Sequence, residues 1–162
     1  MRFAVRVVLC CSLALSGARA SDIAVFCSPD LAHAVTTAHA AAIERDVARE
    51  YGLRDTDTLP NMVIFITTRE GARTAGIPVT TPIVVDHVKL RSLGGASVYH
   101  IWLIDTSNDA GLAKAIATAI NDDIGAGKTA KEITELTRHV CTRLQAKVSV
   151  GELADQEARR IR

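Results

Sequence analysis

Two histidines in neighbouring β-rich segments are the residues of this chain best suited to chemistry. His87 lies in the run Ile83–Arg91 and His100 lies in the run Ser97–Asp105, with Gly94-Gly95 between the two runs. Alternating apolar residues on both sides of a glycine pair predict a β-hairpin. The sequence therefore predicts that both imidazoles lie on one small piece of antiparallel sheet.

The pairing within this hairpin decides which side chains share a face. If Gly94-Gly95 forms a two-residue turn, Leu90 pairs with Tyr99 and Val88 pairs with Ile101. One face then holds the apolar side chains Val84, Val88, Leu90, Tyr99, Ile101 and Leu103. The other face holds the candidate binding residues His87, Lys89, His100 and Trp102. A one-residue change in register exchanges the two faces.

Two functions fit this second hairpin face. The first is a non-catalytic surface, there or beside the alanine-rich helix that follows, that binds a protein or a component of the cell envelope. The second is a hydrolase of unrecognised type, in which His87 and His100 act with an acid such as Asp86 or Asp105. An exposed polar face without a ligand, or one covered by a helix, explains the same residues and stays an alternative.

The familiar catalytic motifs do not occur in this sequence. Gly127-Lys128-Thr129 resembles the end of a phosphate-binding loop, but the glycine required five residues earlier is Asp122. There is no His-Glu-x-x-His segment and no Gly-x-Ser-x-Gly segment. The sequence therefore predicts no catalytic residue, no metal ligand and no cofactor. It leaves open whether the protein is an enzyme, with the balance toward a non-enzyme.

The first twenty residues have the layout of a secretory signal peptide. Arg2 and Arg6 precede an apolar run from Val7 to Leu15, and Ala18-Arg19-Ala20 is a small-x-small cleavage site. We therefore expect residues 1–20 to be a signal peptide, residues 21–150 to form one domain and residues 151–162 to form a charged tail. The mature protein is expected to be secreted or periplasmic, without a membrane span.

The charge of the mature chain argues against nucleic acid as a partner. Removing Arg2, Arg6 and Arg19 from the 19 basic residues leaves 16, against 18 acidic residues, which is a formal charge of −2. Such a balance offers no basic surface for a polyanion.

The two cysteines of the mature chain are expected to form one disulfide. Cys10 and Cys11 belong to the signal peptide, which leaves Cys27 and Cys141 as one possible pair. Free thiols are disfavoured in an oxidising compartment, and a bridge would join the two ends of the domain. Two separate buried thiols are the alternative.

The order of predicted elements indicates an α+β domain. Ser28-Pro29-Asp30 predicts a helix start, and helical apolar spacing continues to Tyr51, before Gly52. Met62–Thr68 has apolar side chains on both faces of the expected strand, as in the interior of a sheet. The other predicted helices are Arg69–Ala75, one capped at Ser107 to Asp109 and running to about Ile124, and one from Thr129 to about Val148. These elements predict a mainly antiparallel sheet of three to four strands packed with helices.

The middle of the chain resembles small zincin-type metallopeptidase domains. The resemblance lies in Val63–Pro78, the hairpin that follows and Leu112–Asp123, and it extends over residues 31–148. It implies that a strand, a short helix and further strands precede an active-site helix. Where the family has His-Glu-x-x-His, this chain has the segment Ala115–Ala119, which is Ala-Ile-Ala-Thr-Ala. Because those side chains cannot bind zinc or activate water, the resemblance implies a catalytically inactive relative.

Overall fold

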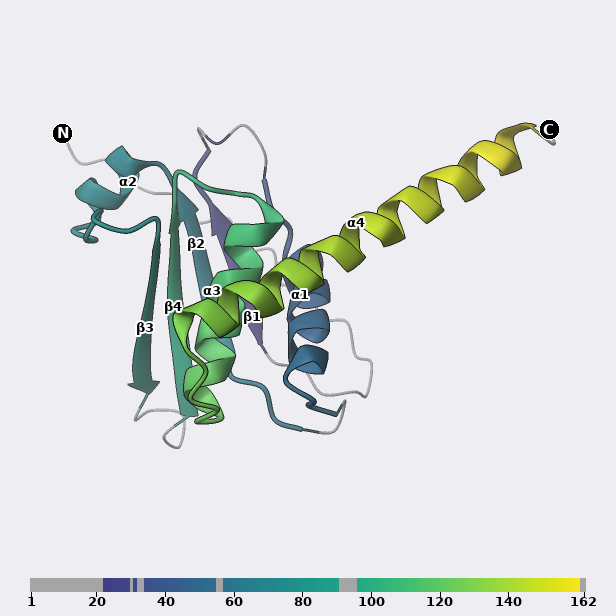
Figure 1. Ribbon diagram of the computed structural model, residues 1–162. Coiled ribbons are helices and arrows are strands. Elements are labelled where there is room, and N and C mark those ends of the chain that lie inside the picture. Colours follow the sequence, from purple (N-terminus) through teal and green to yellow (C-terminus); the bar gives the residue numbers. More distant parts are fainter. Residues whose placement is uncertain (1–21, 30, 32–33, 55–56, 91–95, 161–162) are drawn as a thin grey trace.

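A four-stranded mixed sheet is the centre of the fold (Figure 1). The computed structural model describes residues 22–29, 31, 34–54, 57–90 and 96–160. The strands are β1 (Ile23–Cys27), β2 (Asn61–Thr67), β3 (Ile83–Leu90) and β4 (Ala96–Ile104), and their order in the sheet is β1-β2-β4-β3. β2 runs parallel to both β1 and β4, and β3 runs antiparallel to β4. The α+β class is confirmed, but the expectation of a mainly antiparallel sheet is wrong.

The parallel character comes from two pairings, β2 with β4 and β2 with β1, and β1 is a strand that the sequence analysis did not predict. Val25 of β1 lies opposite Ile64 of β2, and the Ser28 N–H donates to the Ile66 carbonyl at 2.8 Å. Ser28 therefore continues the hydrogen bonding of the sheet and does not cap a helix. The predicted helix start at Ser28 is wrong for this reason.

The first helix, α1 (Thr37–Glu50), begins where a better cap is available. The Thr36 side chain accepts a hydrogen bond from the His39 N–H at 3.2 Å, which satisfies one amide of the first turn. The helix ends before Gly52, as predicted. Asp30, part of the predicted helix start, lies outside the described residues.

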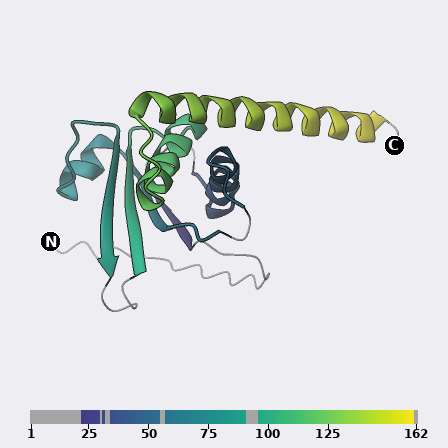
Figure 2. The same ribbon diagram turned by 60° about the horizontal axis from the view of Figure 1, so that its bottom comes forward.

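Three helices lie on one side of the sheet in two layers (Figure 2). α1 and α3 (Asp109–Asp123) pack against the strands, and α4 (Ala130–Arg160) crosses the outer side of both. The short helix α2 (Arg69–Thr74) follows the end of β2. The core between the sheet and these helices contains mostly aliphatic side chains, among them Ile43, Val47, Met62, Ile64, Ile66, Ile101, Leu103, Leu112, Ile116 and Ile120.

The boundaries of α3 and α4 follow the local signals in the sequence. The Asn108 side chain caps α3 by accepting from the Gly111 N–H at 2.7 Å. A capping box is present at the start of α4, where the Thr129 N–H donates to the Glu132 carboxylate at 2.8 Å. α4 continues to Arg160, well past the predicted end near Val148.

Candidate functional site on the open face of the sheet

The observed hairpin register separates the two candidate histidines. His87 pairs with Tyr99, whereas His100 pairs with Asp86. Directly paired residues share a face, so His87 lies on the side of the helices and His100 lies on the opposite side.

The predicted pairing of Leu90 with Tyr99 is wrong because Leu90 pairs with Ala96. The pairing between β3 and β4 ends at Leu90 and Ala96, and the predicted turn at Gly94-Gly95 lies outside the described residues. The resulting offset of three positions exchanges the faces. Lys89 lies on the side of His87, and Trp102 lies on the side of His100. The four predicted binding residues thus do not form one site.

Of the two acids expected to assist the histidines, Asp105 is engaged by Arg69, and Asp86 lies opposite His100 on the face away from His87. Asp105 accepts two hydrogen bonds from Arg69, from the backbone N–H at 2.7 Å and from Nε at 3.0 Å. These bonds from Arg69 lower the pKa of the Asp105 carboxyl. Asp86 accepts from the backbone N–H of His87 at 2.9 Å. The arrangement required for a hydrolase with His87 and His100 on one face is not assembled.

Three aromatic rings from adjacent strands form a continuous stripe on the face opposite the helices. Phe26 of β1 stacks on Phe65 of β2 with ring centroids 5.5 Å apart, and Phe65 stacks on Trp102 of β4 at 4.3 Å. The strand register places these three residues directly opposite one another. His100 meets Phe65 edge-on at 6.3 Å. We call Phe26, Phe65 and Trp102 the aromatic stripe, and this side of the sheet the open face.

Aliphatic side chains surround the aromatic stripe on the open face. By alternation and register, Val63, Val84, Val88 and Val98 belong to this face. Asp86 is the single acidic residue among the described strand positions of this face. Phe26 is 42% exposed, Phe65 and Trp102 are half-buried, and Val98 is buried. The open face is therefore an apolar surface with aromatic residues at its centre, a composition typical of interaction sites.

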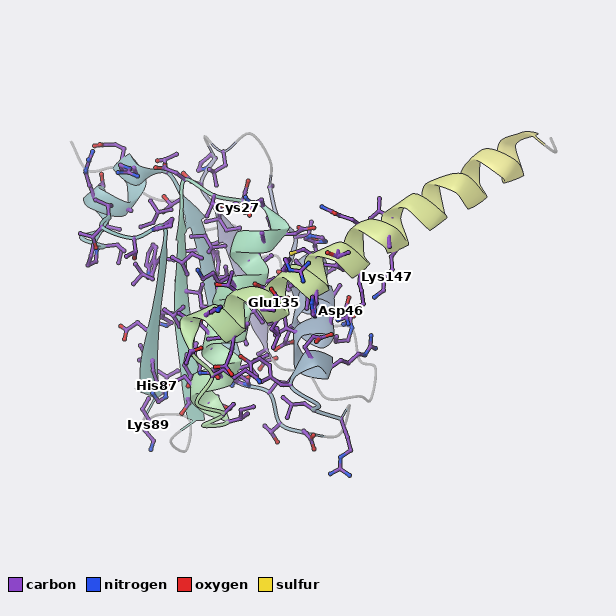
Figure 3. All side chains as sticks on the ribbon, in the orientation of Figure 1. Cys27, Asp46, His87, Lys89, Glu135 and Lys147 are labelled. Carbon is purple, nitrogen blue, oxygen red and sulfur yellow. The ribbon has the colours of Figure 1, made fainter. Side chains whose placement is uncertain are left out.

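His87 lies in the second half of β3 and belongs to a polar cluster at the end of α3 (Figure 3). Its ring stacks on Tyr99 at 4.9 Å, and the Tyr99 hydroxyl donates to Asp122 at 2.8 Å. Burial, together with the Asp122 carboxylate, raises the pKa of Tyr99, so this hydroxyl stays a donor. Burial also raises the pKa of the neighbouring Asp123, although His87 opposes that shift. The cluster provides Asp122 with a hydrogen-bond donor at the negative end of α3, and it connects α3 with the hairpin.

The segment that would carry a zincin motif lies inside the core. Ala115, Ile116, Ala117 and Ala119 of α3 are all fully buried. Within the described ranges, no group of three or more His, Cys, Asp or Glu side chains is placed to hold a metal ion. These positions therefore pack α3 and offer neither ligands nor a cleft.

A crease between α3 and α4 is the other candidate surface. It has a volume of about 420 Å³ and is lined by Ala110, Lys114, Thr134, Thr137, Arg138, Cys141, Thr142 and Gln145. The Arg138 guanidinium donates to Glu135 at 2.6 Å, and the Thr134 and Thr142 hydroxyls donate to carbonyls of their own helix. Most of its polar groups are therefore committed within α4, and the open face is the stronger candidate.

Both cysteines are free thiols in the structure. The Cys27 thiol points toward the Val35 carbonyl, with a sulfur–oxygen distance of 3.6 Å. Burial, with a smaller contribution from Asp109, raises the pKa of the Cys141 thiol. The predicted disulfide stays a prediction.

Ion pairs fasten α4 to α1 before α4 leaves the domain. The Asp46 carboxylate of α1, 7% exposed, accepts from Lys147 Nζ at 2.9 Å and from Arg49 at 3.0 Å. Arg143 of α4 pairs with Glu50. Val148, the next residue after Lys147, is 59% exposed. Figure 3 shows Lys147 and Asp46 facing each other, with the rest of α4 extending away from the sheet.

Fold and site together define an α+β domain with a covered and an open sheet face. No family model matches the chain, and neither the curated proteins nor the solved structures contain a match. None of the helices in the described ranges has the length and apolar character needed to cross a membrane.

Proposed function

We propose that this chain is an exported, non-catalytic protein-binding domain whose open face accepts the apolar side of a helix from a partner protein. The observation that carries the proposal is the aromatic stripe, a continuous stack of Phe26, Phe65 and Trp102 on a face without a packed helix among the described elements. Export to the periplasm or the exterior is inferred from the layout of residues 1–20.

A helix is the partner that best suits this sheet. β1, β2 and β4 form a parallel part of this mixed sheet, and all-parallel sheets have helices on both faces. In this protein, α1, α3 and α4 lie over one face of the sheet. Aromatic side chains dominate the energetics of protein interfaces, and burying a large apolar side chain contributes about 1.5–3 kcal/mol. A helix laid over the stripe would complete a three-layer arrangement.

The absence of catalytic machinery in the sequence supports a binding role over a hydrolytic one. His87 and His100 point to opposite sides of the sheet. The segment Ala115–Ala119 supplies packing residues where a zincin would supply ligands. The proposal therefore includes the interpretation as an inactive peptidase-like domain.

The single tryptophan of the chain gives a direct test, because Trp102 stands in the stripe. The mature protein is titrated with a neutral amphipathic helical peptide, while Trp102 emission and quenching by acrylamide are followed. We expect a blue shift and reduced quenching, whereas a scrambled peptide of the same composition should have no effect. Unchanged Trp102 emission and quenching throughout the amphipathic peptide titration would contradict the proposal.

A pair of matched variants places the binding on the open face. Val63→Lys puts a charge beside the stripe and should abolish the response to the peptide. Ile124→Lys adds the same charge at a position that is 37% exposed at the end of α3, on the other side of the sheet, and should preserve the response. Equal loss in both variants would contradict binding at the open face.

A further inference from the structure

We infer that the Asp86 side chain closes the free edge of β3 to strand addition, which keeps copies of this domain from pairing edge to edge. Within the described ranges, β3 has β4 on one side and no strand on the other (Figure 1). The unpaired N–H and C=O groups of such an edge are a template for a strand of another chain. The inference goes beyond the proposed function, since it concerns the edge of the sheet and not its open face.

The hydrogen bonds between β3 and β4 show which backbone groups face the free edge. The Ile104 N–H donates to the Pro82 carbonyl at 2.8 Å, so the polar backbone group of Pro82 points toward β4. Residues two apart along an antiparallel strand direct their N–H and C=O groups to the same side. The residues of β3 that direct these groups to the free edge are therefore Ile83, Val85, His87 and Lys89.

Side chains already occupy two of these edge groups. The His87 N–H donates to Asp86 Oδ1 at 2.9 Å, and the Thr81 hydroxyl donates to the Ile83 carbonyl at 2.9 Å. An added strand would have to bring a carbonyl oxygen to the His87 N–H, where the Asp86 carboxylate lies, and the two oxygens would repel each other. Strand addition therefore requires Asp86 to give up its hydrogen bond and move away.

The sequence around Asp86 shows why this edge needs protection. β3 has eight residues, whereas strands commonly have about five or six, and long edges are prone to pairing. Ile83–Val88 consists mainly of β-branched residues, a composition that favours aggregation through strands. Between Arg73 and Lys89, Asp86 is the only Asp, Glu, Lys or Arg. A single charge in such a segment acts as a gatekeeper against aggregation.

The experiment compares three single substitutions in the mature, full-length chain. Asp86→Ala removes the acceptor of the His87 N–H, whereas Asp86→Asn keeps an acceptor oxygen. Glu70→Ala removes one negative charge from an exposed position of α2 and serves as the charge control. Molar mass is measured by light scattering across a concentration series. We expect Asp86→Ala to form dimers or larger assemblies as its concentration rises, and the other two variants to keep the mass of the wild type.

Amide hydrogen exchange in the wild type is a second measurement, which does not depend on the folding of a variant. The protection factor of the His87 amide should be several-fold higher than that of the Val85 amide, which faces the same edge. Equal protection would overturn the inference. An unchanged mass for Asp86→Ala, or an equal increase in Asp86→Asn or Glu70→Ala, would overturn it as well. The peptide titration of the wild type tests the open face separately, so either proposal can fail alone.

Discussion

Truncating Phe26 tests whether the two faces of the sheet differ as the structure indicates. Phe26 is 42% exposed on the open face, whereas Ile64 on the adjacent strand is fully buried under the helices. We predict that Phe26→Ala destabilises the fold less than Ile64→Ala. The smaller effect is expected even though phenylalanine is the larger side chain.

The expected sizes follow from burial. Full burial of a large apolar side chain contributes about 1.5–3 kcal/mol, and Phe26 retains somewhat more than half of that, about 1–2 kcal/mol. Loss of the stacking on Phe65 adds about 0.5–1 kcal/mol, so Phe26→Ala should cost about 2 kcal/mol. Ile64→Ala leaves a cavity in a closed core and should cost about 3–4 kcal/mol.

The assay is urea denaturation followed by far-ultraviolet circular dichroism. Equal slopes with denaturant are needed before the free energies of unfolding are compared. A cost for Phe26→Ala equal to or above that of Ile64→Ala would refute the reasoning. It would mean that the open face is packed as tightly as the core.

Three further predictions follow from individual side chains. Burial raises the pKa of Tyr51 from 10.0 to about 12, so the contribution of Tyr51 to stability is complete below pH 10 and is lost as the pH rises toward 12. In the Tyr99→Phe variant, the phenolate absorbance of Tyr51 should appear only near pH 12. Ionisation of Tyr51 near pH 10 in the folded protein would contradict this prediction. Mass spectrometry of the unreduced, exported protein is expected to find Cys27 joined to Cys141, and two alkylatable thiols would refute that prediction. Metal analysis of the native protein is expected to find no stoichiometric zinc, since Ala115–Ala119 offers no ligand, and bound zinc would overturn the view of an inactive relative.

Local signals in the sequence were sufficient for the elements that they define directly. The segment Ser107–Asp109 and Thr129 identified the starts of α3 and α4 because a capping side chain acts on amides two or three residues away. The apolar character of Met62–Thr68 on both sides correctly indicated an interior strand, because β2 lies between β1 and β4.

Features that depend on distant pairing were not accessible from the sequence. β1 is five residues long, and its strand identity depends on its partner β2. The hairpin register rests on the pairing of Leu90 with Ala96, and no residue type in 91–95 specified that pairing. The aromatic stripe was missed for the same reason, since Phe26, Phe65 and Trp102 come together only when both parallel pairings are known. Alternation within Val63–Ile66 placed Phe65 on one side but did not show which neighbours it would meet.

Photo-cross-linking from the centre of the stripe is the most direct test of the central claim. Phe65 is replaced by p-benzoylphenylalanine, the mature protein is irradiated with the amphipathic or the scrambled peptide, and the linked peptides are identified by mass spectrometry. We predict links from position 65 to the amphipathic peptide and none to the scrambled peptide. Links confined to α1 or α3 of the same molecule would contradict an open, helix-binding face.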